Sequence, residues 1–191
     1  MNVLALVPDI GAPSCRFRLL QYKKNLQREG INLIVRGLDR RTGERRAAFV
    51  LAAAADLVIL HRKLLNGSDY QRLRKNCRRL IYDFDDAVIF RDSNSARRRS
   101  RARMRKFKRL VAGADGVIAG NNYLKSLARR FNPFVRVIPT PLDLSDYPLE
   151  PAPSTGRRIG WMGTRSNFVY LSLLRPALAD LLNQNPEYEF Q

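Results

Sequence analysis

Six short apolar runs recur along the first 138 residues, and each is followed by a polar loop and, up to the sixth run, a stretch of helix length. The runs are Val3–Val7, Ile31–Val35, Leu57–Leu60, Leu80–Tyr82, Gly116–Ala119 and Val135–Ile138. Short, continuous apolar runs are typical of strands that are buried on both faces, as in a parallel sheet. Strands that alternate with helices need right-handed crossovers, which place helices on both faces of the sheet. The sequence therefore predicts one α/β domain over residues 1–138, a doubly wound parallel sheet.

The segments between these runs predict the helices. The first begins with Ser14 as its cap and extends to about Glu29, before Gly30. Residues 36–46 are predicted as a charged loop. The other helices are expected at residues 47–55, 69–77 and 95–112, and from Asn122 to about Phe131.

The composition changes after residue 138. Residues 139–157 are rich in proline and have no hydrophobic period, which predicts an interdomain linker. A strand at 158–162, a loop at 163–166, a helix at 168–182 and a strand at 187–191 are expected to follow. Because so few elements cannot close a core, residues 158–191 are interpreted as the beginning of a second, incomplete Rossmann-like domain.

The net charge restricts the partners that the chain can attract. There are 35 Lys and Arg against 17 Asp and Glu, which gives a net charge of +18 and a pI near 11.0. Such a balance attracts polyanions, namely nucleic acid, anionic lipid or phosphorylated substrates. The two cysteines are far apart, which excludes a disulfide framework and a zinc spacing, and a cytoplasmic location is expected. The sequence shows neither a signal peptide nor an apolar run of membrane-spanning length.

Nine of the thirteen residues from Arg97 to Arg109 are Lys or Arg, and none is acidic. We expect this stretch to bind a polyanion or an anionic membrane surface as a peripheral contact, although a solvated helix face is the plainer alternative. The expected contact residues are Arg98, Arg101, Arg105 and Lys108. Aromatic residues are nearly absent from the stretch and no nucleic-acid motif accompanies it, so a nucleic-acid-binding module is an alternative that rests on charge alone.

Three carboxylates, Asp83, Asp85 and Asp86, follow the fourth apolar run and are expected just beyond the end of its strand. Ligands bind at that edge of open α/β sheets, but one Asp could equally cap a turn while the others are solvated. Asp83 and Asp85 form a D-x-D string, which could hold a divalent metal on a sugar nucleotide but also recurs by chance. His61, the sole histidine, ends the third run. A structural hydrogen bond is the commoner role for such a residue, although the imidazole group suits proton chemistry.

Two glycine-containing loops follow strands and open helices. In Gly160–Ser166, small residues would let backbone N–H groups approach a phosphate, although a tight turn explains them equally well. The segment matches neither a GxGxxG fingerprint nor a Walker loop. The other loop leads to Arg16 and Arg18, which point in different directions on a helix, so only one of them is expected to face a phosphate or carboxylate.

These segments together resemble the bacterial GT-B glycosyltransferases of the large retaining family 4 (glycosyl transferases group 1). The resemblance lies in the order and spacing of five stretches. They are Ser14–Arg18, Tyr82–Asp86, Ala114–Asn121, Val137–Asp143 and Ile159–Gly163. Two departures stand out: Pro141 replaces the usual glycine, and the family's donor-binding E-x7-E motif does not occur in the 191 residues.

The resemblance implies two Rossmann-like domains, of which the first holds the acceptor and the second the nucleotide-sugar donor. It implies transfer of the sugar to a glycan, lipid-linked or protein acceptor, with no metal and no cofactor beyond the donor substrate. The resemblance applies to the fold and the acceptor side only, and the chain by itself is expected to have no glycosyltransferase activity. His61, Asp85 and Asp86 are the expected catalytic residues. The expected substrate-binding residues are Arg16, Arg18, Asn121, Gly163 and Thr164.

Overall fold

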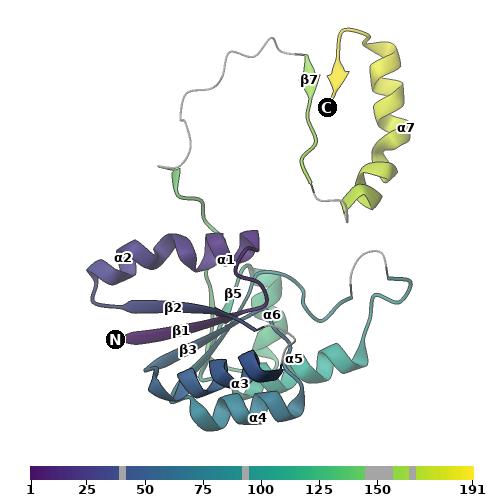
Figure 1. The fold of residues 1–191 in the computed structure, drawn as a ribbon. Helices are drawn as coiled ribbons and strands as arrows, with labels where there is room; N and C mark the ends of the chain where they lie inside the picture. The colour runs from purple at the N-terminus through teal and green to yellow at the C-terminus, as the bar shows by residue number, and fades with distance from the viewer. Residues whose placement is uncertain (39–41, 92–94, 145–156, 164–166) are drawn as a thin grey trace. The chain divides into compact units, whose positions relative to one another are not determined.

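The computed structural model describes residues 1–38, 42–91, 95–144, 157–163 and 167–191 (Figure 1). These residues form two compact units, which are described separately below. The first comprises Met1–Phe90 with Arg99–Asp143, and the second comprises Arg91–Arg98 with Leu144–Gln191.

The first unit is built on a six-stranded sheet in which every neighbouring pair of strands is parallel. In spatial order its strands are β2 (Asn32–Gly37), β1 (Asn2–Val7), β3 (Leu57–His61), β4 (Leu80–Phe84), β5 (Gly116–Ala119) and β6 (Val135–Val137). Each predicted apolar run forms one of these strands. The predicted α/β class is therefore confirmed, and the unit is Rossmann-like.

Helices alternate with these strands along the chain. They are α1 (Pro13–Arg18), α2 (Lys23–Arg28), α3 (Thr42–Leu51), α4 (Gly67–Asn76), α5 (Arg101–Gly113) and α6 (Asn122–Arg129), with single 3-10 turns at Leu20–Tyr22 and Ala52–Ala54. The chain runs outward from β1 to β2, then crosses β1 to reach β3 and continues to β6. Right-handed crossovers therefore place α1 and α2 on one face and α3 to α6 on the other. Figure 1 shows α1 and α2 on one side of the sheet and α3 and α4 on the opposite side.

The larger apolar core lies under α3 to α6. There Tyr82 and Phe84 of β4 stack at 5.5 Å, and Phe107 of α5 packs edge-on against both rings. The face under α1 and α2 carries a smaller cluster around Val3, Ala5 and Leu33. Ile81 and Ile118, farther along that face, are only half-buried. The apolar packing on the α1–α2 face is therefore less extensive than on the face under α3 to α6.

Several helix boundaries differ from the prediction. The helix predicted from Ser14 to Glu29 is interrupted at Leu19, whose φ of −133° and ψ of −58° leave the helical region. Ser14 does not cap it, because the helix begins at Pro13, a residue that suits the first turn since it lacks an N–H. The loop predicted over residues 36–46 overlaps α3, which already begins at Thr42.

The basic helix and the fourth strand also differ from the prediction. Helix α5 begins at Arg101, where Ser100 Oγ accepts a hydrogen bond from the backbone N–H of Arg103, and not at Ser95. Arg98 therefore lies outside the helix. Strand β4 extends to Phe84, so Asp83 is inside the strand and not beyond its end.

The second unit contains a single β–α–β arrangement. Strands β7 (Arg158–Ile159) and β8 (Glu189–Phe190) pair in parallel and α7 (Phe168–Gln184) connects them, as the sequence predicts, although both strands are shorter than expected. No residue of α7 is buried, and Leu173 keeps 73% of its surface exposed. The described residues therefore do not establish a second domain. No helix in the described part of the chain is long and apolar enough to cross a bilayer.

Candidate functional site

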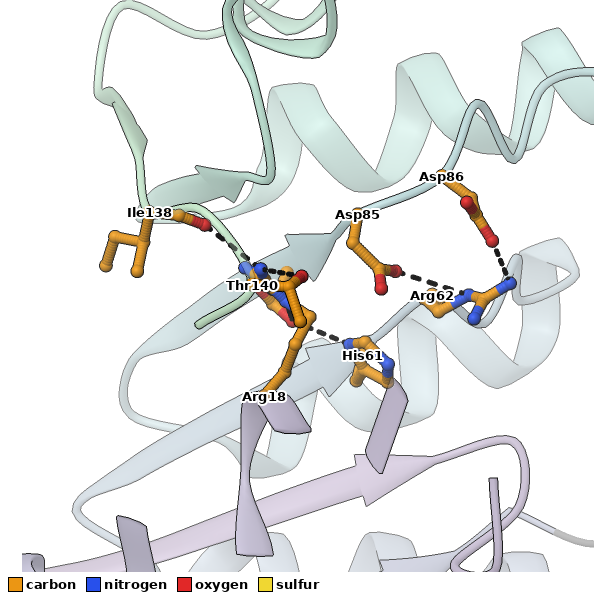
Figure 2. Close-up of polar contacts among 8 residues, drawn as sticks. Arg18, His61, Arg62, Asp85, Asp86, Ile138 and Thr140 are labelled. Carbon is orange, nitrogen blue, oxygen red and sulfur yellow. Dashed lines mark hydrogen bonds and ion pairs between the residues drawn. The ribbon is translucent and has the colours of Figure 1, made fainter. Parts of the chain in front are cut away.

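A buried cluster of three charged or titratable side chains, Arg18, His61 and Asp83, lies at the carboxyl end of β3 and β4. Figure 2 labels Arg18 and His61 of this cluster. Arg18 Nε donates to both carboxylate oxygens of Asp83, at 3.2 and 3.0 Å, and Arg18 Nη2 also donates to Oδ1. His61 Nδ1 lies 2.6 Å from Asp83 Oδ2. Asp83 is 4% exposed and His61 is fully buried, so water does not compete for these contacts.

The fold brings these residues together from distant parts of the sequence. His61 is the last residue of β3 and stands opposite Asp83 in the parallel register of β3 with β4. Arg18 ends α1, the short helix that follows β1. Because β1, β3 and β4 are consecutive in the sheet, their carboxyl ends and the α1 segment meet at one edge.

The charges of the cluster stabilise one another. Burial alone would raise the pKa of Asp83, but the hydrogen bonds from His61 and Arg18 outweigh it and hold that pKa below its ordinary value. Burial also disfavours the charged form of Arg18, yet the Asp83 carboxylate raises the pKa of the guanidinium. An ionised carboxylate only accepts hydrogen bonds, so His61 Nδ1 carries the proton that is shared with Asp83. In a neutral ring, Nε2 then carries a lone pair, and Nε2 has no hydrogen-bond partner among the described residues.

Arg18 also fixes the start of the predicted linker. Its Nη1 donates to Ile138 O at 3.0 Å and to Thr140 Oγ1 at 3.1 Å (Figure 2). The side chain of Gln21 adds a hydrogen bond to Pro141 O at 3.2 Å. The chain that leaves β6 is therefore tied to the same cluster as the ends of β3 and β4.

The predicted catalytic carboxylates Asp85 and Asp86 both interact with Arg62 (Figure 2). Arg62 Nη2 donates to Asp86 Oδ2, and Arg62 Nε lies 3.5 Å from Asp85 Oδ1. Arg62 is the one non-glycine residue with positive φ, +56°, in the described part of the chain. Such a backbone costs about 1–2 kcal/mol, and strain of this kind is concentrated at functional sites.

Asn121, a predicted substrate-binding residue, has a structural role. Its Oδ1 accepts a hydrogen bond from Leu124 N at 2.9 Å and caps α6. Next to it, Gly120 lies so close to the β4–α5 loop that a Cβ atom at this position would be 2.9 Å from the Cα of Asp85. The turns after β4 and β5 are therefore packed backbone against backbone.

The remaining predicted residues do not join the cluster. Arg16 is exposed and its guanidinium lies over the ring of Phe17, so of the two arginines in this segment only Arg18 turns inward. Gly163 belongs to the second unit, where a Cβ would lie 2.5 Å from the Trp161 ring, and Thr164 lies outside the described residues. The predicted membrane or polyanion contacts Arg98, Arg101, Arg105 and Lys108 are all exposed.

A largely apolar cavity of about 400 Å³ adjoins the buried cluster. Arg18 and Asp83 line one part of it, and Leu19, Ile59 and Pro141 are among its apolar walls. The cavity therefore lies on the α1–α2 face of the sheet, where the apolar cover is thin.

Two residues of the site were missed by sequence reasoning. The sequence pattern groups Asp83 with Asp85 in a D-x-D string, whereas in the structure Asp83 is the carboxylate that binds Arg18 and His61. The signal for Arg62 is a cation directly after a strand-ending histidine, followed later in the sequence by two aspartates. Within the described residues, no three His, Cys, Asp or Glu side chains are grouped as a metal site would require.

Comparison with known proteins adds no assignment. No family model matches this chain. No curated protein shows significant similarity to it.

Proposed function

We propose that this chain is the acceptor-side part of a retaining GT-B glycosyltransferase. The complete protein would transfer a sugar from a nucleotide-diphosphate donor to a glycan, lipid-linked or protein acceptor. The proposal rests on the resemblance of the sequence to that family and on the fold of the first unit, which is Rossmann-like.

One observation supports the proposal most directly: Arg18 joins three of the segments that carry the resemblance. It belongs to Ser14–Arg18, binds Asp83 of Tyr82–Asp86, and donates to Ile138 and Thr140 of Val137–Asp143. A fourth segment reaches the same edge, because Gly120 packs against Asp85. Residues that lie far apart in the sequence thus converge at the edge where open α/β sheets bind ligands.

The roles of His61, Asp85 and Asp86 are proposed from this geometry, and those of Gly163 and Thr164 from the resemblance alone. Asp83 orients His61 so that Nε2 is the ring nitrogen left for a sugar hydroxyl, and contact with substrate requires this buried atom to become uncovered. Asp85 and Asp86 hold Arg62 at the edge of the sheet. The departing diphosphate would be stabilised by cations and backbone N–H groups, to which Gly163 and Thr164 are proposed to contribute.

We also propose that the exposed cations of α5 hold the protein on an anionic membrane surface, where a lipid-linked acceptor would be presented. Arg101, Arg105 and Lys108 are exposed on this helix, while Phe107 and Leu110 face the core. Because the apolar residues are used internally, contact with lipid would be electrostatic and peripheral.

The test is a transfer assay with a panel of labelled UDP-, GDP- and ADP-sugars and an extract of lipid and glycan acceptors. The product of the longest reading frame that contains these residues is compared with the 191-residue chain. We expect the longer product to transfer or hydrolyse at least one donor. The 191-residue chain, which has no E-x7-E motif, is expected to show no turnover near an ordinary enzymatic rate of about 1 per second or faster.

A longer product that neither binds nor turns over any nucleotide sugar would contradict the proposal. Salt-sensitive binding to any nucleic-acid duplex, unaffected by nucleotide sugars, would instead favour the alternative of a basic nucleic-acid-binding module.

A further inference from the structure

A second cavity, of about 440 Å³, lies at the carboxyl end of the sheet. Pro8, Ala12 and Ser14 line it from the segment after β1, and Arg62 and Lys63 line it from the loop after β3. The chain runs from β1 outward to β2 and returns across β1 to β3, so the direction of winding reverses between β1 and β3. Ligands of open α/β sheets bind in the crevice at such a switch point.

Helix α5 also lines this cavity. Arg103 and Lys106 line the cavity and are three positions apart, so they lie on the same side of the helix. Arg103 Nε donates to Val88 O at 2.7 Å, which fixes this guanidinium against the loop after β4. Both side chains are only half-exposed, unlike Arg105, which points away to solvent. The basic stretch thus has two sides, one at the surface and one at the cavity.

The lining of the cavity is strongly positive. Four of its residues, Arg62, Lys63, Arg103 and Lys106, are cations, and no Asp or Glu is among the described residues that line it. Arg62 forms an ion pair with Asp86, and this carboxylate offsets part of its positive charge. Ser14 adds a hydroxyl group. A group with one or two negative charges and several acceptor oxygens matches such a lining.

We propose that this cavity binds the phosphate ester of a small ligand, with Arg103 and Lys106 as its principal contacts and Lys63 as a third. If the proposed function is correct, the ligand is the acceptor, and its phosphate lies beside the edge that holds His61. Only the identification as acceptor rests on the proposed function, because the cavity and its charges do not depend on it. A soluble phosphate ester and a lipid headgroup offer the same chemistry to these residues.

The test uses the 191-residue chain and glycerol 3-phosphate, with inorganic phosphate as a second probe, in calorimetric or NMR titrations. Lys106→Gln should weaken binding of glycerol 3-phosphate about tenfold, since one charge-assisted contact is lost. Lys106→Arg should retain most of the affinity. Lys24→Gln removes the same charge from an exposed position on α2, which lies on the opposite face of the sheet, and it should leave this affinity unchanged. Lys63→Gln provides a second variant in another element, should Lys106→Gln alter the thermal unfolding curve.

A second arm measures binding to vesicles of phosphatidylglycerol. If the ligand is lipid-borne, Lys106→Gln should reduce vesicle binding more than Lys24→Gln does, even where the soluble ester binds weakly. Equal effects of the two variants in both arms would overturn the proposal. Binding of glycerol 3-phosphate through Lys106, together with a longer product that neither binds nor turns over any nucleotide sugar, would support this site and contradict the glycosyltransferase proposal.

Discussion

Arg18 and Asp83 are 65 positions apart in the sequence and form a buried pair in which one guanidinium contacts both oxygens of one carboxylate. Through this pair, the end of α1 is joined to β4 and to the chain that leaves β6. A buried ion pair is weak support for stability by itself, because the Coulombic gain is offset by desolvation. Removing one partner is costly, however, since the other charge is then left without compensation.

We therefore expect Asp83→Asn to lower the free energy of unfolding by about 3 kcal/mol at pH 7, since Arg18 loses its counter-charge in a buried site. Urea unfolding followed by circular dichroism measures this difference. Glu29→Gln, which changes an exposed carboxylate at the end of α2, is the matched control and should alter stability by less than about 0.5 kcal/mol. Equal stability of the Asp83→Asn variant and the wild type would show that the pair contributes no net stability.

The contribution of Asp83 should also depend on pH. Its folded-state pKa is lowered, so its stabilisation is complete above the unfolded value of about 3.9 and is lost as the pH falls through the lower folded-state value. The part of the stability difference between the wild type and Asp83→Asn that comes from ionised Asp83 should therefore shrink as the pH falls below about 4. Unfolding titrations at four or five pH values test this, and a difference that stays constant down to pH 3 would contradict it.

The tautomer of His61 is a prediction that NMR can read directly. Because ionised Asp83 can only accept, the neutral imidazole should carry its proton on Nδ1 and leave Nε2 unprotonated. His61 is the sole histidine, so a long-range 1H–15N spectrum needs no assignment by mutation. A spectrum of the Nε2–H tautomer would be incompatible with the proposed orientation. Asp83→Asn serves as the comparison, since an amide can donate to Nδ1 and so permits the other tautomer.

The strands could be predicted from the sequence because each is marked by apolar residues that are adjacent in the sequence. Val3–Val7 and Leu57–Leu60 are continuous apolar runs of strand length, a pattern that is typical of buried strands. The interruption at Leu19 had no such signal, since neither Gly nor Pro lies between Ser14 and Glu29. Arg18, just before the interruption, makes its contacts with Asp83, Ile138 and Thr140, all of which are distant in sequence.

The same reasoning explains why the role of Asp83 was missed. A carboxylate ordinarily marks the end of a buried strand, because burial of an unpaired charge is costly. Here the charge is compensated by two partners, and neither lies within 20 residues of Asp83. The local sequence pattern therefore predicts the edge of the sheet at which the cluster lies. That Asp83 is its central residue depends on contacts with residues that are distant in the sequence.

The close approach of Gly120 to Asp85 predicts a steric effect. In Gly120→Ala, the added Cβ would meet backbone at 2.9 Å, so the turns after β4 and β5 must move apart. We expect a loss of about 1–3 kcal/mol in unfolding free energy. Gly43→Ala is the control, because a Cβ added there would meet no atom within 4 Å and its place in α3 favours alanine by about 0.5–1 kcal/mol. Equal effects of the two substitutions would show that the turns are not closely packed.

The last prediction concerns the outward side of α5. Replacing Arg101, Arg105 and Lys108 together with Gln should weaken binding to anionic vesicles about a hundredfold at low salt, since each cation near such a surface contributes about 1 kcal/mol. Arg98, which lies before the helix, is left in place so that the variant tests α5 alone. Co-sedimentation with anionic and neutral vesicles measures the effect. Binding of the wild type should fade towards 1 M salt, where the Debye length falls to about 3 Å.

The control for this variant also removes three positive charges, but it removes them from another helix. Lys23, Lys24 and Arg28 are three exposed cations of α2, on the opposite face of the sheet from α5. Their replacement by Gln should leave most vesicle binding intact if the α5 surface is the contact. If both triple variants lose binding equally, attraction follows net charge and no docking surface exists on α5. If neither loses binding, the basic stretch is a solvated helix face.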